Sequence, residues 1–264
     1  MKIFFTSDLH LHGTCYEEEM ELLKSKVGQA NPDVLAISGD ISDMHGWNTY
    51  AFFAGFDIPV VFCLGNHDFV DRTVDDTHEQ MRHWREEAIS NGVRNAHCLD
   101  IEGHFDTGGI RFYGNVLWYD GSLYNGGDPN PFMNNIWSYW LDSRILRFNP
   151  TLENKKCVAQ MKHEQSLARG RKCVMLTHCV PHRGLNLFDA DTPLSIANCY
   201  SGMHDLFGFH HIHPDLALCG HTHRRTNMEY HYSGYGIIKD IPCINSGNDY
   251  FGRSGDIICD TIEI

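Results

Sequence analysis

Short apolar runs recur along this chain, and five of them end abruptly in polar residues. The run at 59–64 is typical, because the tetrapeptide GNHD at 65–68 follows it at once. An apolar run of this length, bounded by turn residues, predicts a buried strand. Apolar residues at helical spacing lie between the first runs, at 16–27 and 48–56. Strands that alternate with helices predict parallel βαβ units, and therefore an α/β fold. The five runs lie at 2–6, 34–37, 59–64, 172–176 and 216–219.

The residues that follow these runs are of types that bind metal ions. Open α/β folds place their ligand sites at the carboxyl ends of the strands, so we expect these residues to lie together. Successive side chains of a strand point to opposite faces, so the spacings Asp8-x-His10 and His221-x-His223 should each place two side chains on one side. The metal-competent residues at the strand ends are Asp8, His10, Asp40, Asn66, His67, His178, His221 and His223.

The chemistry of this set favours a catalytic metal site. Carboxylate, imidazole and amide oxygen suit Mn, Fe, Co, Ni or Zn, and the absence of thiolate argues against a structural zinc site. The set is larger than one open catalytic ion needs. We therefore expect two ions, ~3.5–4 Å apart, which can hold a hydroxide between them and act at phosphorus. Gly39, Gly65 and Gly220 precede three of the ligands and should permit tight turns and close backbone approach.

The order of these blocks resembles that of the calcineurin-like metallophosphoesterases. The family pattern is Asp-x-His, Gly-Asp-x-x-Asp, Gly-Asn-His-Asp or -Glu, a lone His and Gly-His-x-His. The resemblance implies a four-layer αββα sandwich of two mixed β-sheets flanked by helices, with the metal site at the carboxyl ends of the strands. It also implies that a hydroxide bridging two divalent ions, manganese being our first choice, attacks a phosphoester in line. The matching blocks are DLH at 8–10, GDISD at 39–43, GNHD at 65–68, His178 and GHTH at 220–223.

The resemblance also implies a role for each residue. His67 would bind no metal but would lie beside the leaving-group oxygen, to which an imidazolium can donate a proton. Asp68 would orient His67, so these two are the predicted catalytic residues. The implied metal ligands are Asp8, His10 and His223 for one ion, Asn66, His178 and His221 for the other, and Asp40 as the bridge.

Charge narrows the range of substrates. The chain has 34 acidic and 21 basic residues, for a net charge of −13. This balance disfavours the clustered basic surface of a nucleic-acid-binding protein. We therefore expect a phosphorylated small molecule or a nucleotide-like compound, either a phosphomonoester or a phosphodiester. A metal-dependent DNA nuclease is the alternative, and a non-catalytic metal-binding interaction scaffold is the third hypothesis.

Composition also bears on compartment. None of the 10 cysteines forms a Cys-x-x-Cys pair, and several lie in apolar runs, which predicts buried thiols in a reducing environment. No apolar run approaches the ~20 residues that a membrane helix needs. We therefore expect a cytoplasmic protein that does not act at a membrane.

The remaining expectations concern organisation. Residues 1–264 should form a single domain with loop-rich insertions at about 120–149 and 181–213. Helices are expected at 77–91 and from Pro150 to about 168, and a short strand at 116–118. Two arginines that follow ligand loops, Arg72 and Arg183, are candidates for holding a phosphate. A cluster of histidines is interpreted as structural, and it comprises His204, His210, His211 and His213.

Overall fold

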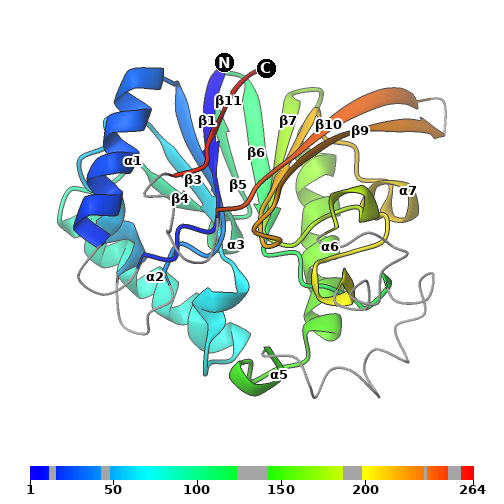
Figure 1. Cartoon of the computed structure of the whole chain (residues 1–264), viewed down its shortest axis with the longest axis horizontal. Coiled ribbons are helices and arrows are strands. Elements are labelled where there is room, and N and C mark those ends of the chain that lie inside the picture. Colours follow the sequence, from blue (N-terminus) through cyan, green and yellow to red (C-terminus); the bar gives the residue numbers. More distant parts are fainter. Residues whose placement is uncertain (12–15, 43–47, 124–141, 187–197, 235–236, 249–256) are drawn as a thin grey trace.

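Two mixed β-sheets form the centre of the computed structural model (Figure 1). The model describes residues 1–11, 16–42, 48–123, 142–186, 198–234, 237–248 and 257–264. The first sheet has the strand order β11-β1-β2-β3-β4, in which β1 to β4 are parallel and β11 is antiparallel to β1. Its strands are β1 (Lys2–Thr6), β2 (Val34–Ser38), β3 (Val60–Cys63), β4 (Ala96–Cys98) and β11 (Asp260–Glu263).

The second sheet has the strand order β5-β6-β7-β8-β10-β9. Strands β6, β7, β8 and β10 are parallel, and the two outer strands are antiparallel to their neighbours. The strands are β5 (His104–Thr107), β6 (Ile110–Asn115), β7 (Lys172–Thr177), β8 (Leu216–Cys219), β9 (Arg225–Gly234) and β10 (Ile237–Ser246).

The sheets pack face to face, with helices on both outer faces. Alternate side chains of β1 show this, because Ile3 and Phe5 join Phe112 of β6 in the core between the sheets. Phe4 faces the other way and packs in the cluster that contains Leu23 of α1. The four-layer sandwich expected from the sequence is therefore confirmed. Helices α1 (Tyr16–Ala30) and α2 (Val74–Ser90) cover the first sheet, and α6 (Pro150–Leu167) and α7 (Leu206–His210) the second.

Local sequence signals explain where α6 begins and ends. Asn149 caps the helix, since its side-chain oxygen accepts a hydrogen bond from the Thr151 amide at 3.0 Å, and Pro150 occupies the first turn. Gly170 follows with φ 80°, a conformation that ends a helix readily. Three further short helices lie near the strand ends: α3 (Leu99–Glu102), α5 (Asp142–Ile145) and the 3₁₀ turn η4 (Arg183–Leu185). None of the described helices is long and apolar enough to cross a membrane.

Two expected elements differ in the structure. The helix expected at 48–56 is a short 3₁₀ turn, η1 (Thr49–Phe53), which Asn48 caps. The strand expected at 116–118 is absent, since β6 ends at Asn115. There the Val116 amide donates to Asp100 at 3.0 Å, and Leu117 takes a left-handed φ of 48°, so the extended ladder cannot continue.

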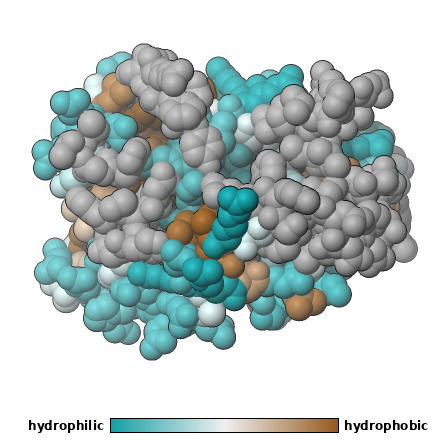
Figure 2. All heavy atoms as spheres, turned by 60° about the horizontal axis from the view of Figure 1, so that its bottom comes forward, coloured by the Kyte–Doolittle hydropathy of each residue, from teal (hydrophilic) through white to brown (hydrophobic). Residues whose placement is uncertain are grey.

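The expected insertions fall partly outside the described residues, at 124–141 and 187–197. The division of the chain into one domain with two insertions therefore stays a prediction. Figure 2 brings forward the lower side of Figure 1, toward which β1 runs. The described residues on that face are mostly hydrophilic around a small hydrophobic area near the centre of the view.

Candidate metal centre

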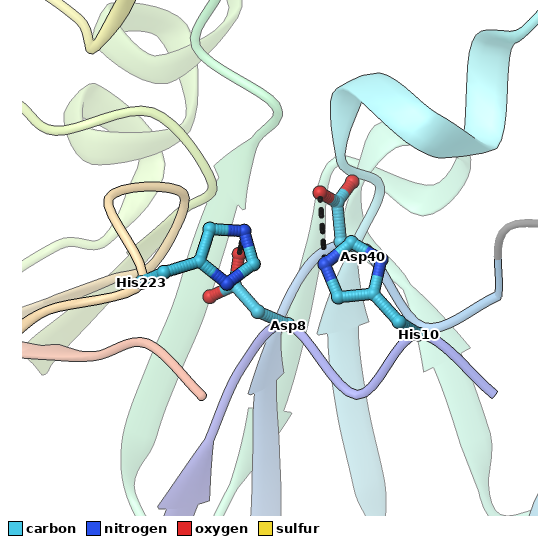
Figure 3. Close-up of side chains that lie close together, drawn as sticks. All are labelled: Asp8, His10, Asp40 and His223. Atoms are coloured by element: carbon cyan, nitrogen blue, oxygen red, sulfur yellow. Dashed lines mark ion pairs between the residues drawn. The ribbon is translucent and has the colours of Figure 1, made fainter. Parts of the chain in front are cut away.

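The ends of the strands bring six of the seven predicted metal ligands into two groups. Each group offers ligand atoms that all lie within 4.8 Å of one another. Figure 3 shows the first group, in which Asp8 faces His223 and His10 lies beside Asp40. Asp40 belongs to both groups, which is the arrangement that a bridging carboxylate requires. The groups are Asp8, His10, Asp40 and His223, and Asp40, His178 and His221.

The seventh predicted ligand, Asn66, completes the second group. It lies in η2 (Asn66–Phe69), directly after β3. Its side-chain oxygen is 2.9 Å from His178 Nε2, which in turn lies 3.3 Å from Asp40 Oδ2 and 3.1 Å from His221 Nδ1. An amide oxygen, a carboxylate and two imidazoles therefore converge on one point. The structure brings all seven residues together, although it does not by itself test whether they bind metal.

The backbone that carries these side chains is not extended. Five of the predicted ligands have left-handed φ values between 45° and 71°: Asp8, His10, Asp40, His221 and His223. Strand alternation therefore does not pair Asp8 with His10 or His221 with His223, contrary to the expectation from the sequence. β1 ends at Thr6 and β8 at Cys219, so both pairs lie in loops. Each left-handed non-glycine residue costs about 1–3 kcal/mol, which is typical of functional sites that the surrounding fold holds in place.

The glycines of the motifs make room for ligands that come from other motifs. A Cβ atom at Gly39 would lie 2.5 Å from His178 Nδ1, and one at Gly65 would lie 2.0 Å from Asp40 Oδ1. At Gly220 it would lie 2.6 Å from Asp8 Oδ2. The close backbone approach expected from the sequence is confirmed, and it explains why these positions require glycine.

Backbone carbonyls fix the orientation of three imidazoles. One ring nitrogen of each bonds a main-chain oxygen: His178 Nδ1 with Ser38 at 2.9 Å, His221 Nε2 with Tyr200 at 2.7 Å, and His223 Nδ1 with Asn248. A ring nitrogen that donates its proton in this way leaves the other nitrogen as a lone-pair donor toward the site. This is the usual arrangement of histidines that bind metal ions.

The electrostatics around Asp40 fit a cation. Burial would raise the pKa of Asp40, but the positive charges of His178, His67 and His10 hold it well below its usual value. Burial opposes a charge on His178, yet Asp40 raises the pKa of His178 to about 9. Burial and the charge on His178 lower the pKa of His221 to about 3. Asp40 is therefore a buried anion that favours positive charge beside it.

One oxygen of Asp40 is left for a ligand. Oδ1 accepts the His67 amide at 3.0 Å, but Oδ2 accepts no hydrogen bond from the described part of the chain. The nearest donors are His178 Nε2 at 3.3 Å and His10 Nε2 at 3.8 Å. Asp40 is only 1% exposed, and a buried carboxylate oxygen without a hydrogen bond is costly unless nearby positive charge compensates it. The donor set and this oxygen together fit divalent cations.

The predicted catalytic pair lies at the edge of the site. The His67 ring meets the His10 ring edge-on, with centroids 4.9 Å apart, and His67 belongs to neither group found among the described residues. Asp68 Oδ2 accepts the Gly65 amide at 2.7 Å and so holds the turn. Burial, with the nearby charge of Asp40, raises the pKa of Asp68 to about 7. The orienting role of Asp68 toward His67 stays a prediction.

Sequence reasoning missed Asp142. This residue begins α5, is 2% exposed, and accepts hydrogen bonds from Asn66 Nδ2 at 3.2 Å and Tyr119 Oη at 2.7 Å. A carboxylate can only accept these bonds, so the amide group of Asn66 must turn its NH₂ to Asp142 and its oxygen to His178. Asp142 lies within the segment at about 120–149 that the sequence predicts to be a loop-rich insertion, and nothing local in the sequence distinguishes it from other acids.

The remaining candidates from the sequence add no described residue to the two groups. Asp43 of the second motif and two histidines that follow ligand blocks and could contact substrate, His12 and His45, fall outside the described residues. The histidine cluster contributes to neither group among the described residues, as its structural interpretation requires: His204, His210, His211 and His213.

The chain matches a known protein family over most of its length. A model of the calcineurin-like phosphoesterase family matches residues 1–225. The chain belongs to the calcineurin-like phosphoesterase family. The resemblance inferred from the order of the motifs is thereby confirmed. Members of this family act on phosphorylated substrates with divalent metal ions.

Solved structures show the same fold. Phosphopantetheinyl hydrolase from Mycobacterium tuberculosis matches with a TM-score of 0.70 at 14% identity, over 99% of this chain and 95% of that one. A dimetal phosphatase from Danio rerio matches with a TM-score of 0.54 at 14% identity, over 94% of this chain and 87% of that one. At such identities the likeness concerns the fold alone. No match was found among curated proteins.

Proposed function

We propose that this member of the family is a phosphoesterase that uses two divalent metal ions to hydrolyse a phosphomonoester or phosphodiester of a small, nucleotide-like or otherwise phosphorylated molecule. The observation that carries the proposal is the position of Asp40 in both ligand groups. A carboxylate shared by two sets of imidazole, carboxylate and amide donors suits a dinuclear centre. Manganese is the metal we favour, with iron, zinc, nickel or cobalt as alternatives.

The residues divide the work. Asp8, His10 and His223 would hold one ion, Asn66, His178 and His221 would hold the other, and Asp40 would be shared. The two cations, when bound, supply positive charge to the phosphoryl oxygens and lower the pKa of water, which provides the nucleophile. The chain itself supplies a rigid frame, because three imidazoles are fixed by main-chain oxygens and Asn66 is fixed by Asp142. Such preorganised charge is usually the largest contribution to catalysis.

His67 is proposed to protonate the leaving oxygen. Its backbone amide is fixed on Asp40 and its ring lies beside His10, so it is near the phosphoryl group that the ions would hold. It stands outside both ligand groups found among the described residues, as a residue that protonates the leaving group should. A general acid in this place typically contributes about 10²–10⁴-fold to the rate.

We propose a reducing compartment because the cysteines that the structure describes form no disulfides. None of the nine cysteines in the described part of the chain forms a disulfide, and eight of them are buried. Buried thiols without disulfide partners suit a reducing compartment such as the cytoplasm.

The experiment is a metal-dependent hydrolysis assay on protein that has been stripped with a chelator and reloaded with Mn²⁺. Substrates are p-nitrophenyl phosphate, bis-p-nitrophenyl phosphate and a panel of nucleotides. We expect Mn²⁺-dependent turnover that His67→Ala reduces about 10²–10⁴-fold while the metal content stays near two ions per chain. His83→Ala, an exposed histidine on α2, is the matched control and should retain activity.

Three outcomes contradict the proposal or one of its assignments. Absence of metal-dependent turnover on every substrate, together with fewer than one bound metal per chain, would favour the interaction scaffold. Degradation of DNA ends with Mn²⁺ in preference to small esters would favour the nuclease. Loss of bound metal in His67→Ala would show that His67 is a ligand.

A further inference from the structure

A cavity of about 150 Å³ lies between the first turns of α2, the first half of α6 and the segment that follows β6. The two helices cover different sheets (Figure 1), so the cavity lies where the two halves of the sandwich meet. None of the seven predicted metal ligands lines it in the described part of the chain. A cavity of this volume holds a benzene-sized molecule or a few waters. Its lining includes Phe69, Val74, His78, Asp100, Trp118 and Glu153.

One part of this lining is aromatic. The ring of Phe69, at the end of η2, meets the ring of Trp118 edge-on with centroids 5.1 Å apart. It meets the ring of His78 in the same way at 6.1 Å. Val74 and Val116 add apolar surface. Aromatic rings favour further rings in offset or edge-on contact, and their faces attract cations, so this lining suits a flat aromatic group.

A buried carboxylate lies in the same lining. Asp100 is 8% exposed, and it accepts the amides of Leu64 at 2.7 Å and Val116 at 3.0 Å on different oxygens. Each oxygen therefore keeps a second lone pair. Asp100 makes no ion pair with any residue that the structure describes. The two amides compensate only part of the cost of a buried charge, which leaves a place for a cationic donor.

The other charges around the cavity also favour a cation. Lys156 is exposed and its Nζ is paired with Glu153 at 2.8 Å. Burial lowers the pKa of His78, so this ring is neutral at neutral pH. Among the described residues of the lining, three carboxylates therefore face one ammonium that already has a partner. The cavity should repel anions and attract cations.

We propose that this cavity binds a small, flat aromatic cation, namely a protonated heteroaromatic base. An N–H group of the base donates to Asp100, while the ring packs against Phe69 and Trp118. One ring fills the available volume, so larger fused systems are excluded. The inference is independent of the proposed function, because no residue of the cavity lining is assigned a part in hydrolysis.

The position of the cavity gives such a ligand contact with the loop of the third motif. Asp100 holds the Leu64 amide directly before Gly65, and Phe69 ends the turn that begins at Asn66. A bound ligand would therefore touch the frame of this loop without touching the metal ions. The site is thus separate from the one that binds the phosphoester.

The test compares 4-aminopyridine, which is protonated at neutral pH, with aniline, which has the same shape and is neutral. Calorimetric titration of the full chain, once as purified and once loaded with Mn²⁺, measures both affinities. We expect 4-aminopyridine to bind with a Kd of about 1 mM or below in both forms. Aniline should bind at least about 10-fold more weakly. Crystals soaked with 4-aminopyridine should show its ring in the cavity and a ring or amino nitrogen beside Asp100.

Two variants and a control locate the binding. Val74→Phe adds bulk to a half-buried residue of the lining and should abolish binding of 4-aminopyridine. Leu152→Phe adds aromatic surface at a position on α6 that is 56% exposed and outside the lining, and it should bind like the wild type. Asp100→Asn keeps the shape but removes the charge. It should lower the affinity for 4-aminopyridine about 10- to 100-fold and change that for aniline less than about threefold.

Each contrary result overturns the inference. Equal affinities for the two compounds would show that the cavity does not select charge. Binding that survives Val74→Phe would show that the compound binds elsewhere, and soaked crystals with only water in the cavity would show that it binds no such base. If Asp100→Asn does not fold, the two compounds and Val74→Phe still decide. Hydrolysis of p-nitrophenyl phosphate can succeed or fail without changing any of these readouts, so failure of the proposed function is distinguishable.

Discussion

Gly65→Ala tests whether the motif glycines exist to let ligands approach one another. The added Cβ atom would lie 2.0 Å from Asp40 Oδ1 and 2.3 Å from the Asp40 backbone nitrogen. Rotation of the Asp40 side chain relieves only the first of these contacts, so the backbone of one loop must move as well. Gly65 has φ −115°, which alanine adopts freely, and the effect therefore cannot come from backbone strain.

The size of the effect follows from the overlap. Ordinary contact begins near 3.4 Å, so even after the side chain rotates, the Asp40 backbone and Gly65 must separate by roughly 1.1 Å. Overpacking of this kind costs about 1–3 kcal/mol of folding free energy. Because Asp40 belongs to both ligand groups, the displacement should weaken both metal sites. Loss of residues that hold ligands typically costs about 10–100-fold in metal affinity, and displacement of a shared ligand should cost at least as much.

The assay has two parts and an internal control. Urea denaturation in the presence of a chelator measures the free energy of unfolding, and calorimetric titration with Mn²⁺ measures affinity and stoichiometry. Gly28→Ala adds the same methyl group inside α1, where nothing lies within 4 Å. That variant should be more stable by about 0.5–1 kcal/mol, with unchanged metal binding. Wild-type metal affinity and stoichiometry in Gly65→Ala would refute the reasoning.

Two further predictions concern buried carboxylates. Asp142→Leu should weaken one of the two metal sites by about 10–100-fold in a Mn²⁺ titration, because Asn66 loses the acceptor that fixes its amide; unchanged affinity at both sites would contradict this. For Asp100, which accepts the amides of Leu64 at 2.7 Å and Val116 at 3.0 Å, burial raises the pKa to about 6. The folded protein therefore holds a proton here that the unfolded chain releases near pH 4, and the stabilisation is lost as pH rises through about 6. In chelator, the unfolding free energy of the wild type relative to Asp100→Asn should fall by about 1 kcal/mol between about pH 5 and about pH 7.5, and a rise would refute the assignment.

Much of the site could be predicted because its signals are local. An apolar run followed by glycine and a polar residue marks the end of a buried strand, and β2, β3 and β8 end as this pattern predicts. The carboxyl ends of parallel strands then meet by topology. The order of the motif blocks supplied the family, and with it the four layers. None of this required knowledge of how the second sheet pairs its strands.

The rest depends on contacts between distant parts of the chain. Left-handed conformations at residues such as Asp8 and His221 are unfavourable in isolation, and they persist only because the assembled loops hold them. The His221 amide, for example, bonds Asp8 at 3.0 Å across 213 residues of sequence. Asp142 was missed for the same reason, since its partner Asn66 lies 76 residues away. The residues that neighbour each partner in the sequence do not indicate such long-range hydrogen bonds.

The shared role of Asp40 can be tested most directly by anomalous diffraction from crystals loaded with Mn²⁺. We predict two peaks roughly 3.5–4 Å apart, with the Asp40 carboxylate in contact with both and with His67 in contact with neither. A single peak, or a metal ion bound by His67, would contradict the dinuclear centre proposed for this chain.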